Sequence, residues 1–249
     1  MKKKIILILF CAGICLSVHA QIRLDPYYPY SKYTFGLGMG FSEIYGNLNH
    51  SNSEPVFRLS VDRNINPWIS FGAEVMRGAL SDYEDRNHWT TGLSVYNKIT
   101  TFDLHGKMAL GELFKGPNSF AMKTLFGLYV GFGVGVINND VSNVTLKFEP
   151  QNKLYINDIY SSAIKTKTTA LYMPFNLGFD LHLTRRCMFN INYQFSYAFS
   201  DYLDGYDFPQ PQAHNYYNDM FSVLSFGLSF YIGRVGVTEE LIGTSPQSK

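Results

Sequence analysis

The chain has 249 residues, a formal net charge of +1 and only 16% charged residues. This balance argues against a nucleic-acid-binding protein or a disordered tail, and the length is that of one domain. Aromatic residues also reach 16%, with 18 Tyr, 20 Phe and 21 Gly, which favours β-strands and interfacial aromatic belts. The mean hydropathy of −0.08 is too low for several membrane helices, but it suits strands with alternating apolar and polar faces.

Residues 1–20 have the pattern of a secretory signal peptide. Three lysines precede an apolar segment at residues 5–18, and Ala20 ends a small-residue cleavage site that leaves Gln21 as the mature N-terminus. The alternative is an uncleaved signal anchor, although no basic flank follows the apolar segment. Removal of the signal leaves Cys187 as the single cysteine, so we expect neither an internal disulfide nor a thiol metal site.

After an extended lead-in at residues 21–31, apolar residues recur at every second position in eight segments. A period of two is that of a β-strand. We expect a bulge at Pro174, because proline cannot donate to a sheet hydrogen bond, and a surface loop with at most a small hairpin at residues 138–167. The predicted strands lie around residues 32–45, 57–62, 68–78, 93–109, 126–136, 169–182, 187–200 and 220–233.

The segment 126–136 shows this alternation most clearly. Its bulky apolar face suits lipid, while the other face consists of Tyr129 and four glycines and suits the crowded interior of a narrow barrel. A membrane helix with a GxxxG seam is the alternative. The apolar run between Lys123 and Asn138 has only 14 residues, however, and a membrane helix needs roughly 20.

These observations predict an all-β fold, an eight-stranded antiparallel up-and-down transmembrane β-barrel at residues 32–233, followed by a polar periplasmic tail at 234–249. The connections after the second, fourth and sixth strands are expected to be short and the others longer, as in barrels with short periplasmic turns and long outer loops. The alternative is a soluble lipocalin-like barrel, whose apolar face would turn inward around a ligand.

The chain resembles the small eight-stranded outer-membrane barrels of the OmpA/OmpX type, specifically the single-domain form exported by Bacteroidota. The resemblance rests on the glycine-alternating first strand with residues 44–48, on the turn 66–70, on 127–137 and on 201–204. It implies a barrel assembly signal at the end of the last strand, although here the chain continues beyond it. The residues of this signal are Ser225, Gly227, Phe230 and Ile232. The resemblance implies an architecture and leaves activity open.

Charged residues on the predicted inward face form a candidate polar network. Charges in a barrel interior must be paired. If the second and third strands pair so that Arg58 faces Glu74, an ion-pair network crosses the barrel, with Asp103 and Lys107 as further members. The network is interpreted as a structural plug, since eight strands enclose only enough room for side chains; a gate in a narrow solute path is the alternative. The predicted members are Arg58, Asp62, Glu74, Asp103, His105, Lys107 and Asp180.

No nucleophile–base spacing, phosphate loop or His/Cys cluster is recognisable, so we expect no enzyme, no cofactor and no metal site. Acidic residues among tyrosines at 201–219 leave binding of a hard cation or a glycan open. The sequence predicts a monomeric outer-membrane barrel in contact with lipid, with a structural, surface-contact or envelope-assembly role. The alternatives are a narrow channel gated by interior ion pairs and a partner-binding component of an envelope secretion machine, acting through the periplasmic turns or the tail.

Overall fold

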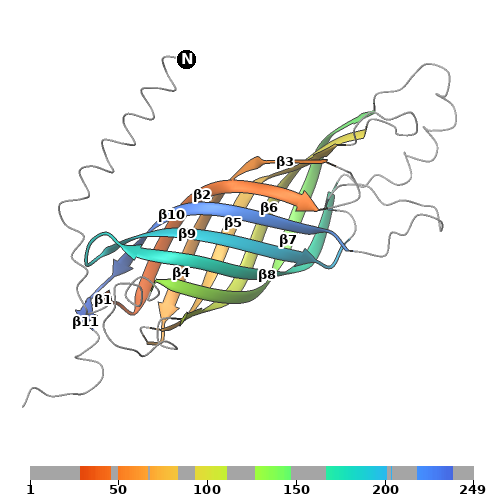
Figure 1. Ribbon diagram of the computed structural model, residues 1–249. Helices are drawn as coiled ribbons and strands as arrows, with labels where there is room; N and C mark the ends of the chain where they lie inside the picture. The colour runs from red at the N-terminus through yellow and green to blue at the C-terminus, as the bar shows by residue number, and fades with distance from the viewer. Residues whose placement is uncertain are drawn as a thin grey trace, which may run out of the picture.

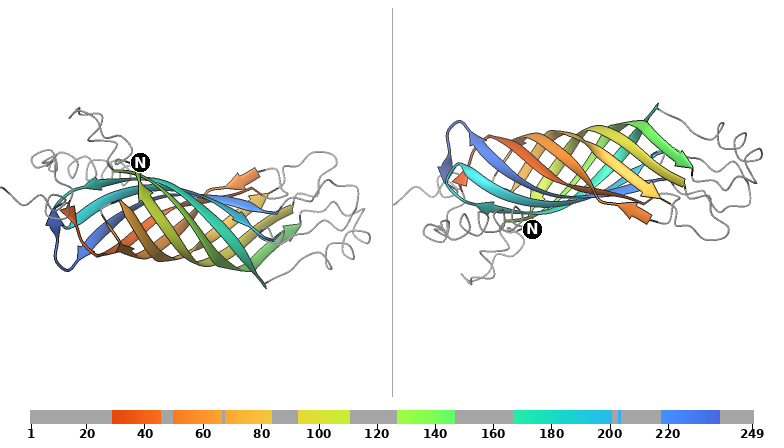
Figure 2. Two further views of the ribbon diagram at one scale, coloured as in Figure 1. Left: turned by 90° about the horizontal axis from the view of Figure 1, so that it is seen from below. Right: turned by 90° about the horizontal axis from the view of Figure 1, so that it is seen from above.

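The computed structural model describes residues 29–45, 50–66, 68–83, 93–110, 127–146, 167–200, 203 and 218–237. Eight antiparallel strands close into a barrel (Figures 1 and 2), because each pairs with the next along the chain and β10 pairs with β2. This confirms the predicted fold class. The barrel strands are β2 (Tyr33–Tyr45), β4 (Glu54–Asn64), β5 (Ile69–Tyr83), β6 (Leu93–Ala109), β7 (Leu128–Leu146), β8 (Lys167–His182), β9 (Cys187–Ala198) and β10 (Met220–Ile232).

Three shorter strands lie at the two ends of the barrel. β3 (His50–Asn52) pairs with β5 and extends the rim at one end. At the opposite end β1 (Pro29–Tyr30) pairs with β11 (Gly236–Val237), so the segments before and after the barrel meet there (Figure 1). We call this the terminal end and the other the loop end. The lead-in and the tail, which were predicted as separate extended and polar segments, are therefore joined.

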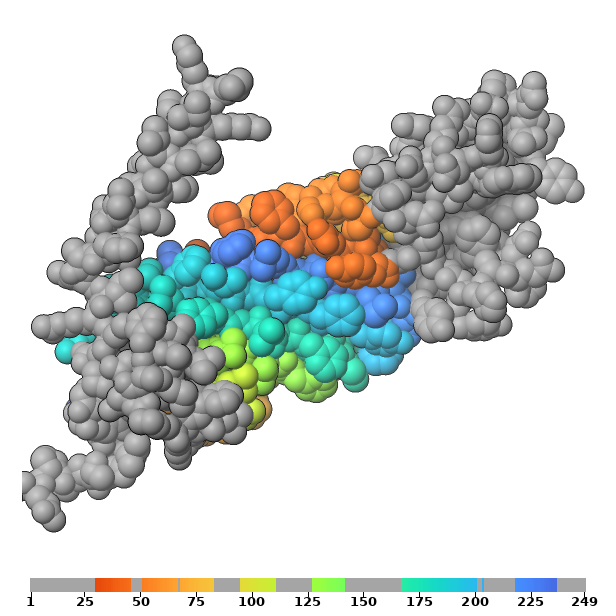
Figure 3. Space-filling view, viewed as in Figure 1, coloured from red at the N-terminus to blue at the C-terminus, as the bar shows by residue number. Residues whose placement is uncertain are grey.

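The outer surface of the barrel is an apolar band. On β7, Phe132 and Val134 are about half exposed, whereas the intervening Gly133 and the next residue, Gly135, are buried. The same alternation on the other strands covers the wall seen in Figure 3 with apolar side chains. The apolar face therefore points outward, as lipid contact requires, and the soluble lipocalin-like alternative is wrong. Among the most exposed side chains are Met39, Phe57, Phe71, Leu104, Phe132 and Leu171.

Two predicted connections differ from the structure. β7 continues to Leu146 and β8 begins at Lys167, where Asp140 pairs with Lys167, so the loop predicted at 138–167 was too long. At the terminal end, the connection between β6 and β7 spans residues 110–127, whereas the loop-end connection between β5 and β6 spans only 84–92. The predicted alternation of short and long connections is therefore wrong at this pair. Within the described ranges, no helix is long and apolar enough to cross a membrane.

The bulge predicted at Pro174 is also wrong. The β7–β8 ladder is interrupted between the pairs Phe132–Phe175 and Gly135–Tyr172, but its register is the same on both sides. Proline lacks an N–H, so it opens the ladder without inserting a residue. The register shift lies instead between β6 and β7, at Tyr96 and Asn97, where an extra β7 residue lies opposite the junction, as in a β-bulge.

Glycines on the inward face make room for two tyrosine rings. A Cβ atom at Gly135 would lie 2.6 Å from Cε1 of Tyr172, and a Cβ atom at Gly178 would collide with the phenol of Tyr129. Both tyrosines are buried in the interior. The bare face of β7 and the glycine of β8 thus create the space in which the interior hydrogen-bond network is built.

Candidate functional site in the barrel interior

The interior changes character along the barrel axis. On β4 the inward residues run from Val56 near the loop end through Arg58 and Ser60 to Asp62 near the terminal end. On β6, Ile99 likewise lies on the loop side of the polar residues 101–107. The terminal half of the interior therefore holds the charged side chains described below, whereas the loop half holds an apolar cluster beside buried polar side chains such as Asn97 and Asp219.

Arg58 and Glu74 form the ion pair expected between these strands. Arg58 Nε donates to Glu74 Oε1 at 2.9 Å, and Arg58 Nη2 pairs with Glu74 Oε2. In the β4–β5 register Glu74 lies opposite Ser60, so the arginine side chain reaches along the strand to the carboxylate. Arg58 Nη1 also contacts the hydroxyl of Ser225 on β10. The pair thus links three strands across the interior.

A second group is centred on His105. Its Nδ1 lies 2.8 Å from Asp103 Oδ1 and its Nε2 lies 2.9 Å from Asp62 Oδ1. Because carboxylates accept hydrogen bonds, both ring nitrogens must donate, which is the geometry of an imidazolium ion. Lys107 Nζ lies 3.1 Å from Asp62 Oδ1, and the Tyr172 hydroxyl donates to Asp103 Oδ2 at 2.8 Å. These residues form a continuous chain of charge-assisted hydrogen bonds.

On the opposite wall of the polar half, hydrogen bonds between neutral side chains connect the strands. Tyr129 donates through its hydroxyl to Asn192 Oδ1 at 3.0 Å, and Asn192 donates to Asn176 Oδ1 at 2.9 Å. Tyr129 thus bridges β7 to β9, and Asn176 continues the contact to β8. The sequence placed Tyr129 on the inward face but did not predict its partners, because hydrogen bonds across a barrel depend on the register of several strands at once.

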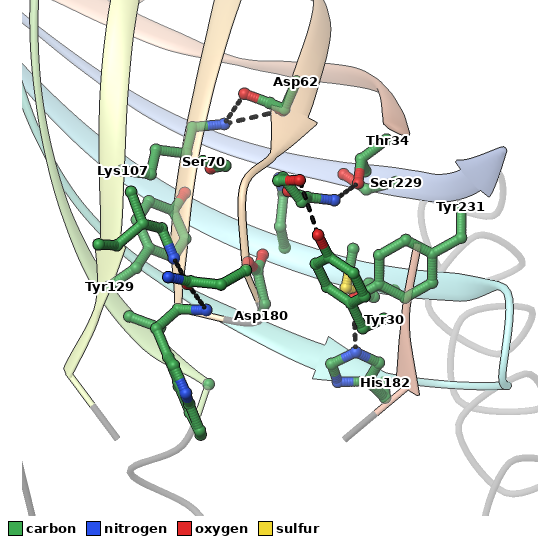
Figure 4. A pocket seen from close by; sticks show the side chains of 18 residues that line it. Tyr30, Thr34, Asp62, Ser70, Lys107, Tyr129, Asp180, His182, Ser229 and Tyr231 are labelled. Carbon is green, nitrogen blue, oxygen red and sulfur yellow. Dashed lines mark hydrogen bonds and ion pairs between the residues drawn. The ribbon is translucent and has the colours of Figure 1, made fainter. Parts of the chain in front are cut away.

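Asp180 differs from the other predicted members. It lines a cavity of about 90 Å³ at the terminal end (Figure 4), together with Lys107, Tyr129, Tyr30, His182 and Tyr231. Among the residues that the structure describes, none donates a hydrogen bond to its carboxylate or lies within ion-pair distance of it. It interacts with Lys107 only over a longer distance. The structure therefore does not join Asp180 to the bonded network.

The loop half is filled by an apolar cluster that the sequence analysis missed. Leu203, from the connection between β9 and β10, is fully buried in this cluster. Its N–H donates to Asp219 Oδ2 at 2.7 Å, and its carbonyl accepts from Asn97 Nδ2 at 2.5 Å. The strand members lie at inward positions of the alternation, which was the available signal. The cluster consists of Ile44, Val56, Met76, Leu80, Ile99, Ile137, Tyr172, Ala198, Leu203, Phe221 and Val223.

The remaining predicted residues are placed as follows. Phe230 and Ile232 of the proposed assembly signal are exposed on the outer face, whereas Ser225 and Gly227 face inward. Ala20, Gln21 and the tail beyond Val237 lie outside the described residues, as does most of the acidic loop 201–219. In the described part of the chain, no three metal-ligating side chains gather into a group that could hold a metal ion.

Comparison with known proteins gives a family match for most of the chain. The family model described as "Outer membrane protein beta-barrel domain" matches residues 8–230. A search of curated proteins gave no match.

Similar solved structures include Neisserial surface protein A, at 12% identity and a TM-score of 0.42, covering 81% of this chain and 98% of that one. OprG from Pseudomonas aeruginosa matches at 15% identity and a TM-score of 0.43, covering 82% and 98% of the two chains. Ail of Yersinia pestis, crystallised with a heparin analogue, matches at 9% identity and a TM-score of 0.41, covering 80% and 96%. At such low TM-scores these likenesses carry no argument about function.

Proposed function

Because the chain belongs to the outer membrane protein beta-barrel domain family, we propose that it is a sealed outer-membrane barrel with a structural or surface-contact role. It is a non-enzymatic outer-membrane protein, and its apolar outer face contacts lipid. The observation that supports a sealed barrel is the filled interior. Charge-paired side chains occupy the terminal half, and the apolar cluster occupies the loop half.

The apolar cluster argues most strongly against a solute path. A gate made of ion pairs opens when its charges change partners, but the interior ion pairs described above lie in the terminal half and not within the apolar cluster. There Met76, Ile99 and Phe221 are fully buried, and Leu203 packs against them from the loop side. A hydrated ion would have to displace these side chains and lose its hydration in an apolar segment, which costs many kcal/mol. The interior ion pairs are therefore proposed to be a plug.

Single-channel recording in planar bilayers tests this proposal. We expect no discrete conductance steps from the purified protein, and none from Arg58→Ala or Glu74→Ala, because the apolar cluster is intact in each. The matched variant is Phe221→Ala, which removes a fully buried ring from the cluster while it leaves the ion pair in place. Discrete steps in the parent protein, or steps that appear when Arg58 or Glu74 alone is removed, would support the gated channel instead.

A contact role requires partners at one of the two ends. In barrels of this kind the terminal end faces the periplasm and the loop end faces outward. The pairing of β1 with β11 holds the start of the tail at the terminal end of the barrel, which favours the tail as a contact segment for another envelope protein. Cross-linking and pull-down from native membranes, with the full chain and with a chain that ends at Val237, test this role. Equal recovery of the same partners by both chains would exclude the tail.

A further inference from the structure

The cavity at the terminal end contains a carboxylate whose charge the described residues do not balance. Arg58 pairs with Glu74, Lys107 with Asp62, and His105 with Asp103 as well as Asp62. With His105 counted as an imidazolium, three interior cations of the polar half thus pair with three carboxylates, those of Glu74, Asp62 and Asp103. Asp180 is the fourth carboxylate. A charge in such an interior needs a counter-charge, and Asp180 is partly exposed to the cavity.

The same cavity shows how the barrel accommodates an ammonium group. Lys107 Nζ is held by the Asp62 carboxylate at 3.1 Å and lies 5.9 Å from the centroid of the Tyr129 ring. One carboxylate and one tyrosine face thus bind one ammonium, a combination of ion pairing and cation–π attraction. Two further tyrosines, Tyr30 and Tyr231, line the same cavity as Asp180 (Figure 4).

The Tyr30 hydroxyl retains acceptor capacity beside the cavity. The Tyr30 hydroxyl donates a hydrogen bond to the carbonyl oxygen of Asn64 at 2.7 Å. A phenol oxygen also has lone pairs that can accept hydrogen bonds. The Tyr231 hydroxyl lies 3.1 Å from His182 Nε2. An ammonium beside Asp180 would therefore meet a carboxylate, phenol oxygens and aromatic faces.

We propose that this cavity binds an organic ammonium group, with Asp180 as its anionic anchor and Tyr30 and Tyr231 as the adjoining aromatic wall. The group comes from a free primary amine or from the end of a lysine-type side chain that enters at the periplasmic mouth. A divalent metal fits less well, because the described residues offer no cluster of three ligating side chains. The site goes beyond the sealed-barrel function and does not depend on it, since it lies on the periplasmic side of the apolar cluster.

Ligand-detected NMR with the full-length protein in phosphatidylcholine nanodiscs tests the site. The probe is n-butylammonium chloride, with n-butanol as the neutral analogue of the same shape and sodium chloride at equal ionic strength. Asp180→Asn removes the charge at nearly constant volume. Asp140→Asn is the matched control, because Asp140 is an exposed carboxylate near the loop end. Heat-modifiable gel mobility shows that each variant is folded.

We expect saturable transfer of magnetisation to butylammonium in the parent protein and in Asp140→Asn, with at least about tenfold weaker affinity in Asp180→Asn. Tyr30 lies on β1, outside the barrel wall, and Tyr30→Leu, with its folding checked by the same gel mobility, should weaken binding a few-fold. Binding of Nα-acetyl-lysine amide as well would assign a side-chain source, whereas binding of butylammonium alone would assign a free amine. No saturable binding by the folded parent protein, equal binding by Asp180→Asn, or equal binding of n-butanol would overturn the proposal. The folded parent protein would show no saturable binding if Asp180 were protonated or if Lys107 formed an ion pair with it.

Discussion

Breaking the Arg58–Glu74 ion pair should cost far more stability than breaking the exposed pair of Lys167 and Asp140. Only 11% of the Arg58 side chain and 3% of the Glu74 side chain are exposed. Removing either partner leaves the other charge buried without its counter-ion, which costs about 3–5 kcal/mol. Lys167 and Asp140 lie 3.6 Å apart with 74% and 52% of their side chains exposed. An exposed pair of this kind contributes below about 1 kcal/mol.

Two double-mutant cycles in the same protein measure this difference. One combines Arg58→Met with Glu74→Gln, and the other combines Lys167→Met with Asp140→Asn. The free energy of unfolding is measured by urea titration in phosphatidylcholine vesicles, with the fluorescence of the two tryptophans as the signal. We expect each interior single variant to lose about 3–5 kcal/mol, and the interior double variant to lose much less than the sum of the two.

The coupling energy decides the outcome, because it removes effects that each substitution has alone. For the interior pair we expect a coupling energy several times that of the exterior pair, which should lie near about 0.5 kcal/mol. A coupling energy for Arg58 and Glu74 no larger than that for Lys167 and Asp140 would refute the view that the interior network is a charge-paired plug. Increasing salt should reduce the exterior coupling and leave the interior one nearly unchanged.

Three further predictions concern single positions. Phe221→Ala should destabilise the barrel by about 3–5 kcal/mol in the same urea titration, because it leaves a cavity in the apolar cluster; a loss below about 1 kcal/mol would mean that the cluster is loosely packed. Gly178→Ala should lower the folded yield seen by heat-modifiable gel mobility, since its Cβ would collide with the phenol of Tyr129, and Tyr129→Ala in the same chain should restore part of that yield. The mass of the protein purified from outer membranes should correspond to a chain that begins at Gln21, and a mass that includes residues 1–20 would show that the signal is not cleaved.

The strands could be predicted from the sequence wherever the two faces of the barrel wall have different surroundings. In residues 126–136, lipid on one side and a crowded interior on the other impose a strict period of two. Beyond Asn138 the outward side chains, such as Asp140, become polar and exposed, because the strand has left the apolar band. The alternation of polarity then disappears although the alternation of burial continues, as buried Asn139 and Val141 show. That is why the end of β7 was interpreted as a loop.

The interior was predictable only as a set of inward-facing residues. The contact between Arg58 and Glu74 follows from adjacent strands and opposite charges, so the sequence was sufficient for it. The bond from His105 to Asp62 depends on the pairing of β5 with both of its neighbours, β4 and β6, and a shift of one register position would break it. The burial of Leu203 depends on how a loop folds back over the barrel, for which no periodic signal exists. Long-range contacts of this kind need the three-dimensional structure.

The pairing of β2 with β10 closes the barrel. These strands are the first and last of the wall, so their pairing has the largest sequence separation and carries the largest loop-closure entropy. Opposite one another on their inward faces are Gly36 and Ser229, Gly38 and Gly227, and Gly40 and Ser225. In the middle of this seam, therefore, only very small groups meet on the inward face. Toward the loop end the same seam places Ile44 opposite Phe221, so the bulky contact of the closing pair is confined to the segment that joins the apolar cluster.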